Sequence, residues 1–377
     1  MQQIKIKIVD TQKEQRIFIY LPEKIHEHHE NWVPPIYSDE RKFYDPKYNK
    51  SLLSSDTVLF LAYKNGKPVG RIMGIINRKY NSLHNEKTAR FFNFDCYNDP
   101  EVSYSLLDAA ENWAVKKGMN KIIGPFGFSD KDPQGAQVEG FENIPVIATA
   151  TNLPYLPRLI ENSGYKEETD CLVYKLPIPS QIPDIYQRVF DRVTRNKHIR
   201  LREFTSRRQL KPYIVPVFRL VNETYRSLFG FDEMNEDEMH ELARKYLPML
   251  DPEFTKVITD QDNNPIAFVV ASPNISKGIR KAKGKIFPFG FIHILSSAKH
   301  TDQLDLFLGA VKEKYMNTGL TALLGVSIFN SANKRGLKYI DSHLILESNK
   351  PMRAVMERLN AVIYKRYRVY SKLLIGV

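Results

Sequence analysis

The stretch NKPMRAVMERLNAVIYKRYRVYSK, residues 349–372, decides the fold because the chain contains a second version of it. NLPYLPRLIENSGYKEETDCLVYK, residues 152–175, has the same Asn and Pro at its start and the same Val-Tyr pair near its end. Each copy is typical of a short helix that leads into a strand. The two copies lie 197 positions apart, as counted from Asn152 to Asn349. A repeat with this period predicts two similar units in one chain.

A hairpin signal precedes both copies. VLFLAYKNGKPVGRIMGIIN (58–77) predicts two strands around an Asn-Gly turn, and TKVITDQDNNPIAFVVASPN (255–274) predicts two strands around Asp-Asn-Asn. Pro68 and Pro265 align at the same offset of 197. The hairpins therefore belong to the repeat.

A third block lies between the hairpin and the closing helix. LLDAAENWAVKKGMNKIIGPF (106–126) aligns with FLGAVKEKYMNTGLTALLGVSI (307–328), and both are expected to be a helix followed by a strand. Gly118 and Gly319 are expected to end the helix in a left-handed C-cap.

The repeat predicts an α/β protein with mixed sheets and two tandem domains, residues 1–180 and 181–377. Each domain is expected to run hairpin, strand, helix, strand, helix, strand, with one or two helices before the hairpin. In the second domain, residues 210–230 and 234–248 are expected to form these helices. The Pro-rich segment LPIPSQIPDIY, residues 176–186, marks the join.

Composition narrows the protein class. Hydrophobic residues make up 42% and charged residues 26% of the chain, and no apolar run approaches the roughly 18 residues of a membrane span. The N-terminus lacks the apolar region of a secretory signal, so a cytoplasmic protein without a membrane span is predicted. Cys96 and Cys171 are too few for a disulfide framework and are expected to be buried, reduced thiols.

The formal net charge of +12 favours polyanionic partners. The positively charged residues are concentrated in two stretches, residues 192–211 and residues 277–285. The second stretch contains no acidic side chain. Solvated surface segments are the competing interpretation for both.

The predicted order of elements, with a closing helix of the form Asn-x-x-small-x-x-x-aromatic, resembles the GNAT acyltransferase superfamily over nearly the whole chain, as two copies. Six segments are also similar to a family of bacterial N-acetyltransferase-like proteins: WVPPIYSDERKFYDPKYN, FLAYKNGKPVGRI, FFNFDCYNDPE, GPFGFS, VEGF and NLPYLPRLIENSGY. The resemblance implies acetyl-CoA or another acyl-CoA as cofactor, no metal, and a small-molecule or peptide amine as acceptor.

GNAT enzymes hold the cofactor pyrophosphate on a loop that opens the helix after the fourth strand. In the first half this loop is DCYNDPEVS, whose Asp95, Asp99 and Glu101 suit a helix N-terminus but repel phosphate. In the second half the expected loop is SSAKHTDQ, with an ordinary capped helix as the competing interpretation. The predicted cofactor-binding residues of this loop are Ser296, Ser297, Lys299 and His300.

The closing helix implies the remaining cofactor and catalytic residues. Asn349 is expected to contact the cofactor, and Asn360 is expected to replace the usual C-cap Gly. The tyrosine that protonates the leaving thiolate in many GNAT enzymes is missing in both halves. Glu347, a candidate general base, and Tyr155 are the predicted catalytic residues. Helix capping is the alternative role for Glu347 and Asn349.

The first half contains a long irregular stretch, residues 124–152, beside the expected substrate position. Ser129, Glu139 and Asn152 are its predicted substrate-binding residues, and a structural loop at the domain joint is the alternative. HEHHE (26–30) has metal-ligand spacing, but we interpret it as a solvated helix end.

Two other functions stay open. A Fem-type transferase that uses aminoacyl-tRNA fits the positive charge and the degenerate phosphate loops, and would make tRNA a partner. A non-catalytic binding module with the same fold fits the missing tyrosines.

Overall fold

The computed structural model describes residues 4–147, 149–247 and 250–374 of the chain. The elements of the first half follow in this order: β1 (Ile4–Ile8), α1 (Gln12–Ile25), α2 (Tyr37–Phe43), α3 (Ser51–Ser54), β2 (Ser55–Lys64), β3 (Lys67–Asn77), α4 (Arg78–His84), β4 (Thr88–Cys96), α5 (Pro100–Lys116), β5 (Lys121–Gly124), β6 (Ala136–Glu139), α6 (Leu156–Asn162) and β7 (Lys166–Pro177).

The second half follows a similar order of helices and strands. Its elements are α7 (Asp184–Thr194), β8 (Arg200–Arg202), α8 (Arg207–Tyr225), α9 (Glu236–Tyr246), β9 (Thr255–Thr259), β10 (Pro265–Pro273), α10 (Ser276–Lys281), α11 (Gly290–His300), β11 (Gln303–Val311), α12 (Leu320–Lys334), β12 (Tyr339–Asp341), β13 (Ile345–Leu346), α13 (Lys350–Arg358) and β14 (Val362–Leu373). None of the helices in the described ranges combines the length and apolar character needed to cross a membrane.

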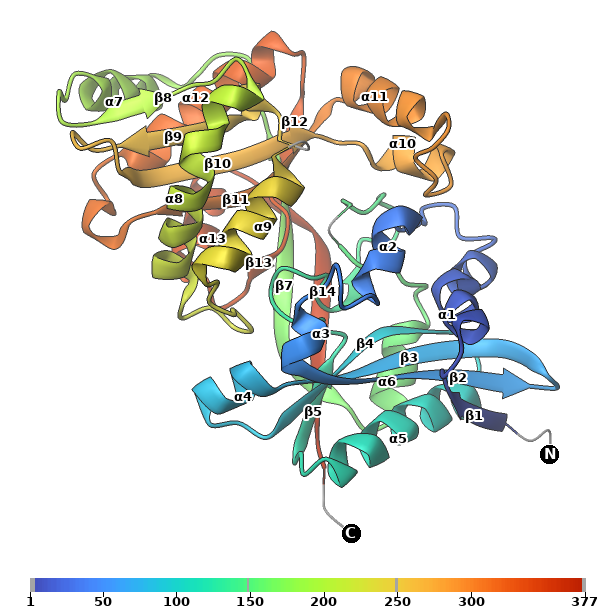
Figure 1. Cartoon of the computed structure of the whole chain (residues 1–377). Coiled ribbons are helices and arrows are strands. Elements are labelled where there is room, and N and C mark those ends of the chain that lie inside the picture. The colour runs from blue at the N-terminus through green and yellow to red at the C-terminus, as the bar shows by residue number, and fades with distance from the viewer. Residues whose placement is uncertain (1–3, 148, 248–249, 375–377) are drawn as a thin grey trace.

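The strands of the described residues form one continuous mixed sheet. Its order is β1-β2-β3-β4-β5-β14-β7-β12-β11-β10-β9-β8, with β6 beside β14 and β13 beside β7. The last strand of the chain therefore lies between two strands of the first half, antiparallel to both. Strand β7 in turn pairs with β12 of the second half. Figure 1 shows β7 and β14 running between the two halves.

Helices cover both faces of the sheet in each half. In the first half, α5 and α6 pack on one face and α1 on the other (Figure 1). In the second half, α7, α12 and α13 share one core, and α8 and α9 share the other. The α/β fold class with mixed sheets is confirmed. The boundary at residue 180 stays a prediction. The two halves exchange their closing strands, because β14 pairs with β5 of the first half and β7 pairs with β12 of the second.

Local sequence signals predicted the positions of several elements correctly. The first hairpin turns at Asn65 and Gly66, whose φ angles of 54° and 73° suit the short turn that Asn-Gly favours. Helices α8 and α9 also lie where they were expected. Asn360 follows α13 with φ 56°, so it replaces the usual glycine. Both cysteines are buried free thiols.

The prediction for residues 307–328 is wrong. The segment is the end of strand β11 followed by the start of helix α12, the reverse of the expected order. Gly319 has φ 98°, but it precedes α12 as its N-cap and does not end a helix. A positive φ is compatible with either end of a helix, so glycine alone did not fix the direction.

A buried ion pair lies where β14 crosses into the first half. Lys365 Nζ and Asp341 Oδ2 are 2.8 Å apart, and both side chains are fully buried. Asp305 lies nearby, and burial together with Asp341 raises its pKa well above the ordinary value. Burial would lower the pKa of Lys365, but Asp341 together with Tyr367 and Asp305 outweighs burial and raises it. The Lys365 ammonium group is therefore the direct partner of the Asp341 carboxyl group at the joint.

We expect Lys365→Met to lower the free energy of unfolding by about 3–5 kcal/mol, because it leaves a buried carboxylate without its cation. Urea unfolding measures this loss. The matched control is Arg219→Met, which breaks an exposed pair with Glu236 and should cost less than about 1 kcal/mol. An equal, small effect of both substitutions would contradict the structural role of the pair.

Candidate functional site

A cavity of about 920 Å³ lies between the first half and helix α9 of the second. Its walls come from the end of α1, the segment 32–51, strand β4, and the irregular stretches 129–136, 146–147 and 149–152. The polar groups of the cavity include His26, Glu40, Arg71 and Asp95, and apolar side chains line much of the rest. Mixed linings of this kind are typical of small-molecule sites.

The cavity opens where strand β4 leaves its neighbour. The parallel pairing of β4 with β5 ends at Arg90 and Ile123. Further along β4, Asn93 has φ 47° and the register with β3 shifts, which marks a β-bulge. Strand β6 continues the line of β5 along β14 after an excursion over residues 125–135. The bulge residue therefore faces the cavity at the gap between β4 and β6.

A hydrogen-bonded chain of polar side chains lies at this gap. His26 Nε2 donates to Asp95 Oδ1 at 3.2 Å, and Arg71 donates from Nε and Nη2 to Asp95 Oδ2 at 3.0 and 2.8 Å. Burial would raise the pKa of Asp95, but Arg71 and His26 outweigh burial and hold it at about 2. Asp95 is therefore ionised at neutral pH and fixes the Nε2–H tautomer of His26.

His26 is also held from its other side. Its Nδ1 lies 3.0 Å from Nδ1 of His29, and its ring stacks on Trp32 with 5.2 Å between centroids. Burial, assisted by His26, lowers the pKa of His29 to about 4, so His29 is neutral at pH 7. Asp95 and these rings together immobilise His26.

Glu40 of α2 is another of the carboxylates that line the cavity. Its Oε1 accepts a hydrogen bond from Tyr44 at 3.1 Å. Burial raises the pKa of Glu40, and the nearby Arg71 offsets only part of this effect. Arg71 acts on both Asp95 and Glu40, yet the pKa of Asp95 is lowered and the pKa of Glu40 is raised. Such a separation suits one group to be a fixed anion and the other to exchange a proton.

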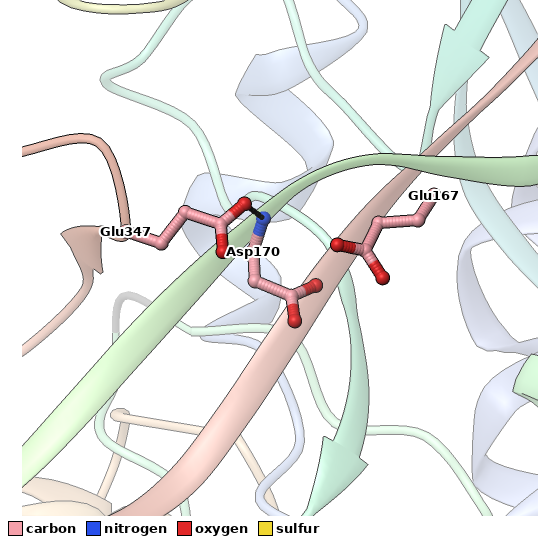
Figure 2. Close-up of side chains that lie close together, drawn as sticks. All are labelled: Glu167, Asp170 and Glu347. Carbon is pink, nitrogen blue, oxygen red and sulfur yellow. Dashed lines mark hydrogen bonds between the residues drawn. The ribbon is translucent and has the colours of Figure 1, made fainter.

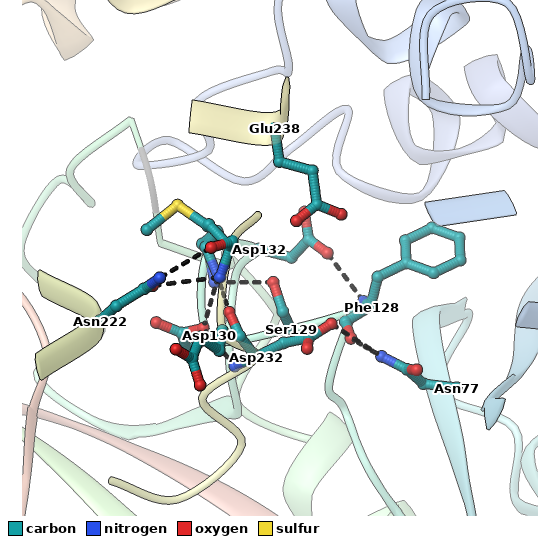
Figure 3. A network of polar contacts seen from close by, with 12 residues as sticks. Asn77, Phe128, Ser129, Asp130, Asp132, Asn222, Asp232 and Glu238 are labelled. Atoms are coloured by element: carbon teal, nitrogen blue, oxygen red, sulfur yellow. Dashed lines mark hydrogen bonds and ion pairs between the residues drawn. The ribbon is translucent and has the colours of Figure 1, made fainter. Parts of the chain in front are cut away.

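A first-half loop, residues 128–132, meets a second-half loop around Asp232 beside the cavity, and Figure 3 shows polar contacts of these loops. In the first-half loop, Asp132 Oδ2 accepts from the Phe128 backbone N–H at 2.7 Å. Lys131 Nζ donates to the Asp232 carbonyl at 2.7 Å, and the Asp232 N–H lies 3.4 Å from Asp130 Oδ1. The long first-half loop is therefore tied directly to the second half.

The predicted first-half residues divide into two groups. Ser129 and Asn152 line the cavity, and Asn152 also bridges to strand β6 by accepting from Gln137 N at 2.6 Å. Glu139 does not belong to the described lining and pairs with Arg366 at 3.1 Å. Tyr155 donates its hydroxyl to the Cys96 carbonyl at 2.8 Å, and burial raises its pKa. Tyr155 is thus engaged with the backbone beside β4.

Glu347 and Asn349 make structural contacts. Glu347 makes two hydrogen bonds with the backbone of Asp170 in β7. Its Oε1 accepts from the Asp170 N–H at 3.0 Å (Figure 2). Its own N–H donates to the Asp170 carbonyl at 2.9 Å. Asn349 caps α13 by accepting from Met352 N. Glu347 is not among the described residues of the cavity lining. Asn349 therefore has the capping role given as its alternative, whereas the described contact of the Glu347 carboxylate is with the backbone of β7 and not with α13.

Three carboxylates in the described residues lie within metal-ligand distance of one another: Glu167, Asp170 and Glu347 (Figure 2). Arginines already neutralise this group. Arg368 donates to both oxygens of Asp170 at 2.8 and 3.0 Å, and Arg366 adds a bond at 3.0 Å. Burial would raise the pKa of Asp170, but Arg368 and Arg366 outweigh it and lower the pKa.

The expected phosphate loop of the second half is a helix. Ser296, Ser297, Lys299 and His300 lie in the last turns of α11, where the helix dipole is negative. They are therefore not at the helix N-terminus on which their predicted role depended. The segment that does follow the fourth strand is residues 312–319, which leads into α12.

The interpretation of HEHHE as a solvated helix end is wrong for His26. Only 3% of its surface is exposed, although Glu27 and His28 are exposed as expected. The sequence signal was an apolar helix face that continues through Ile25 to the tryptophan six residues after His26. Asp95, previously assigned to a phosphate loop, belongs to β4 and is buried.

Known proteins with this architecture were found by structural comparison. The structure is similar to a tandem GNAT protein from the clavulanic acid biosynthesis pathway, with TM-score 0.58 and 11% identity over 100% of both chains. The fold is that of the tandem GNAT proteins. A GCN5-related N-acetyltransferase from Sphaerobacter thermophilus has TM-score 0.54 and 11% identity, with 99% and 97% of the two chains covered.

Two curated proteins are similar to this chain in sequence over nearly its whole length. A bacterial ceramide synthase from Caulobacter vibrioides is 28% identical over 97% of this chain and 96% of its own length. Protein YghO from Escherichia coli is 26% identical, with 95% and 92% covered. No family model matches the chain.

We expect Asp95→Asn to lower the free energy of unfolding at pH 7 by about 3–5 kcal/mol, because buried Arg71 loses its counter-charge. Since the pKa of Asp95 falls from 3.8 to about 2 on folding, this stabilisation is complete above about pH 4 and is lost as the pH drops through 2. Urea unfolding at several pH values measures the convergence of the two proteins.

The control is Asp56→Asn, which removes the partner of Arg78 in a half-exposed pair and should cost less than about 1 kcal/mol. A difference between wild type and Asp95→Asn that stays constant down to pH 2 would contradict the assigned ionisation.

Proposed function

We propose that the protein is an acyl-CoA-dependent N-acyltransferase whose acceptor amine binds in the cavity between the two halves. The observation that carries the proposal is the pairing, at one cavity wall, of a fixed anion with a carboxylate of raised pKa. The GNAT fold supports acyl transfer, and its neighbours suggest an amine acceptor. Acyl-CoA would supply an acyl group activated as a thioester.

The acceptor class follows from the cavity wall and from one relative. Ceramide contains a long-chain amine joined to an acyl group, so the similarity to a bacterial ceramide synthase favours a long-chain amine here. The apolar lining offers burial for such a chain. It includes Trp32, Val33, Phe43, Phe92, Phe94, Val146, Ile147, Leu156 and Leu242.

In this proposal Glu40 is the general base. An amine enters as an ammonium ion and must lose a proton before its nitrogen attacks the acyl carbonyl. Glu40 would take that proton before the attack. As the new C–N bond forms and the C–S bond breaks, the electron pair would leave on sulfur, and the second proton of the nitrogen would pass to that sulfur to give the thiol. Asp95 attracts the ammonium group, and the β-bulge at Asn93 turns the backbone of β4 toward the reacting carbonyl.

The residues of α12 fit the cofactor phosphates better than those of α5. Asp99 already caps α5 by accepting from Glu101 N and Val102 N. Helix α12 begins at Gly319 and, within the described residues, has no side-chain cap, so its first N–H groups are available. Val189 of α7 would lie 2.8 Å from a β-carbon at Gly319, which explains the glycine. Lys314 in the loop before α12 is exposed.

We expect Glu40→Gln to lower kcat by at least about 100-fold, because the amine loses its proton acceptor. Stability should be unchanged or increased, since Gln removes the cost of burying an ionised carboxylate. Amide formation from acyl-CoA and a panel of short-chain and long-chain amines, followed by mass spectrometry, measures the activity.

Two further results test the assignment of Glu40. The rate of the wild type should rise with pH through a pKa above the ordinary Glu value of 4.5. Glu241→Gln, an exposed carboxylate at the cavity, is the control and should keep its activity. Loss of activity together with an equal loss of thermal stability would show that Glu40 is structural.

One pair of variants distinguishes between the two candidate phosphate sites, which are the start of α12 and the end of α11. We expect Lys314→Gln to weaken CoA binding by about tenfold, as for the loss of one hydrogen bond to a charged group, and Lys299→Gln to leave it unchanged. Calorimetric titration with acetyl-CoA, a longer acyl-CoA and free CoA measures both. The reverse pattern would place the phosphates at the end of α11, and no binding by the wild type would contradict the CoA proposal.

A further inference from the structure

Helix α11 and the turn before it expose a continuous run of large apolar side chains. We call this the apolar patch, and its members are Phe287, Phe289, Phe291, Ile292 and Leu295. Phe287 is 81% exposed and Phe289 is 71% exposed. Neighbouring apolar groups of this size are seldom left in water unless they bind a partner.

Lysines surround the apolar patch. Residues 274–301 contain no acidic side chain, and their exposed lysines lie before and after the patch in sequence. These lysines are Lys277, Lys281, Lys283, Lys285 and Lys299. Lysine is depleted at protein–protein interfaces, whereas aromatic groups next to several lysines are typical of anionic membrane surfaces. The charge pattern therefore favours a lipid surface over a protein partner.

The apolar patch and its lysines lie on a hairpin of two tightly packed helices, α10 and α11. Gly278 of α10 crosses α11 so closely that a β-carbon there would lie 2.5 Å from the His293 carbonyl oxygen. Helix α11 has 11 residues and a length of about 16 Å, which suits a position within the interface of a bilayer.

The hairpin also touches the cavity wall. It extends from the second-half sheet toward α2 of the first half (Figure 1). Tyr37 N donates to the Gly284 carbonyl at 3.1 Å, and Arg280 donates to the Glu30 carbonyl. The segment between these two contacts, residues 32–36, lines the cavity. The surface that carries the patch is thus adjacent to one wall of the site.

From these observations we infer that the α10–α11 hairpin docks on an anionic lipid bilayer. The apolar patch enters the interface, and the lysines bind the lipid phosphates. The docked hairpin places residues 32–36 near the bilayer, so a long-chain amine passes from the membrane into the cavity. This delivery step rests on the proposed function, whereas docking itself does not.

Vesicle flotation tests the docking. The wild type should float with vesicles of phosphatidylcholine and phosphatidylglycerol, and bind much less to phosphatidylcholine alone. The triple variant Lys281→Gln, Lys283→Gln, Lys285→Gln should bind on the order of a hundredfold more weakly to the anionic vesicles, with added salt reducing wild-type binding too. The double variant Phe287→Ser, Phe289→Ser should lose binding to both kinds of vesicle.

Matched controls lie elsewhere on the surface. Leu83→Ser removes an apolar group that is 64% exposed on α4, and Lys116→Gln with Lys117→Gln removes two exposed charges after α5. Both controls should bind like the wild type. Equal binding by the wild type and the patch variants would overturn the inference. A dimer in analytical ultracentrifugation that the Phe variant abolishes, without vesicle binding, would assign the patch to a second copy of the chain.

Activity measurements separate docking from the proposed function. The Phe variant should acylate a short-chain amine in solution as fast as the wild type, and lose turnover of a long-chain amine supplied in vesicles. Vesicle binding by a wild type that acylates neither amine would sink the proposed function and leave the docking intact. Full turnover of the vesicle-bound amine by the Phe variant would overturn the delivery step.

Discussion

The placement of β14 between β5 and β7 is the constraint on which the rest of the structure depends. It makes the closing strand of the second half part of the first half's sheet, while β7 carries the pairing on to β12. The crossing brings charged residues into the interior, where the Lys365–Asp341 pair at 2.8 Å satisfies them. Because the sheet is continuous, it holds the loops of the two halves in fixed positions relative to each other. These positions define the cavity wall that includes Ser129 and Met234.

Sequence alone placed the parts of the fold that local chemistry specifies. The Asn65-Gly66 turn, the two helices before the second hairpin, and Asn360 in place of glycine all depend on neighbours in the chain. It failed at residues 296–328, where SSAKHTDQ was expected to be a phosphate loop and residues 307–328 a helix followed by a strand. The structure has the end of α11, then β11, then the start of α12, so the expected phosphate loop is a helix C-terminus. Short apolar runs suit either a strand or a helix, so periodicity did not decide between them. The exchange of closing strands has no local signature, since β7 and β14 have similar sequences.

The candidate site was predictable only in part, for a related reason. Ser129 and Asn152 lie in one irregular stretch, and its length alone drew attention to them. His26 and Asp95 are 69 residues apart in sequence, and what joins them is the packing of the end of α1 against β4. Glu40 acquires its raised pKa from burial, which composition does not reveal. Groups whose chemistry comes from tertiary surroundings are the ones that sequence reasoning missed.

The two halves differ in ways that give the tandem arrangement a physical rationale. Acidic capping by Asp99 makes the N-terminus of α5 unfavourable for phosphate, whereas α12 has a glycine N-cap and an exposed lysine, Lys314, in the loop that precedes it. The first half instead supplies the ionised Asp95 and, in the proposed function, Glu40 as the general base. A nucleotide and an ammonium ion need opposite electrostatic surroundings, which one small domain accommodates poorly. In the proposed function, the phosphates bind to the half with the open helix, and the amine binds where carboxylates from the other half meet the shared cavity.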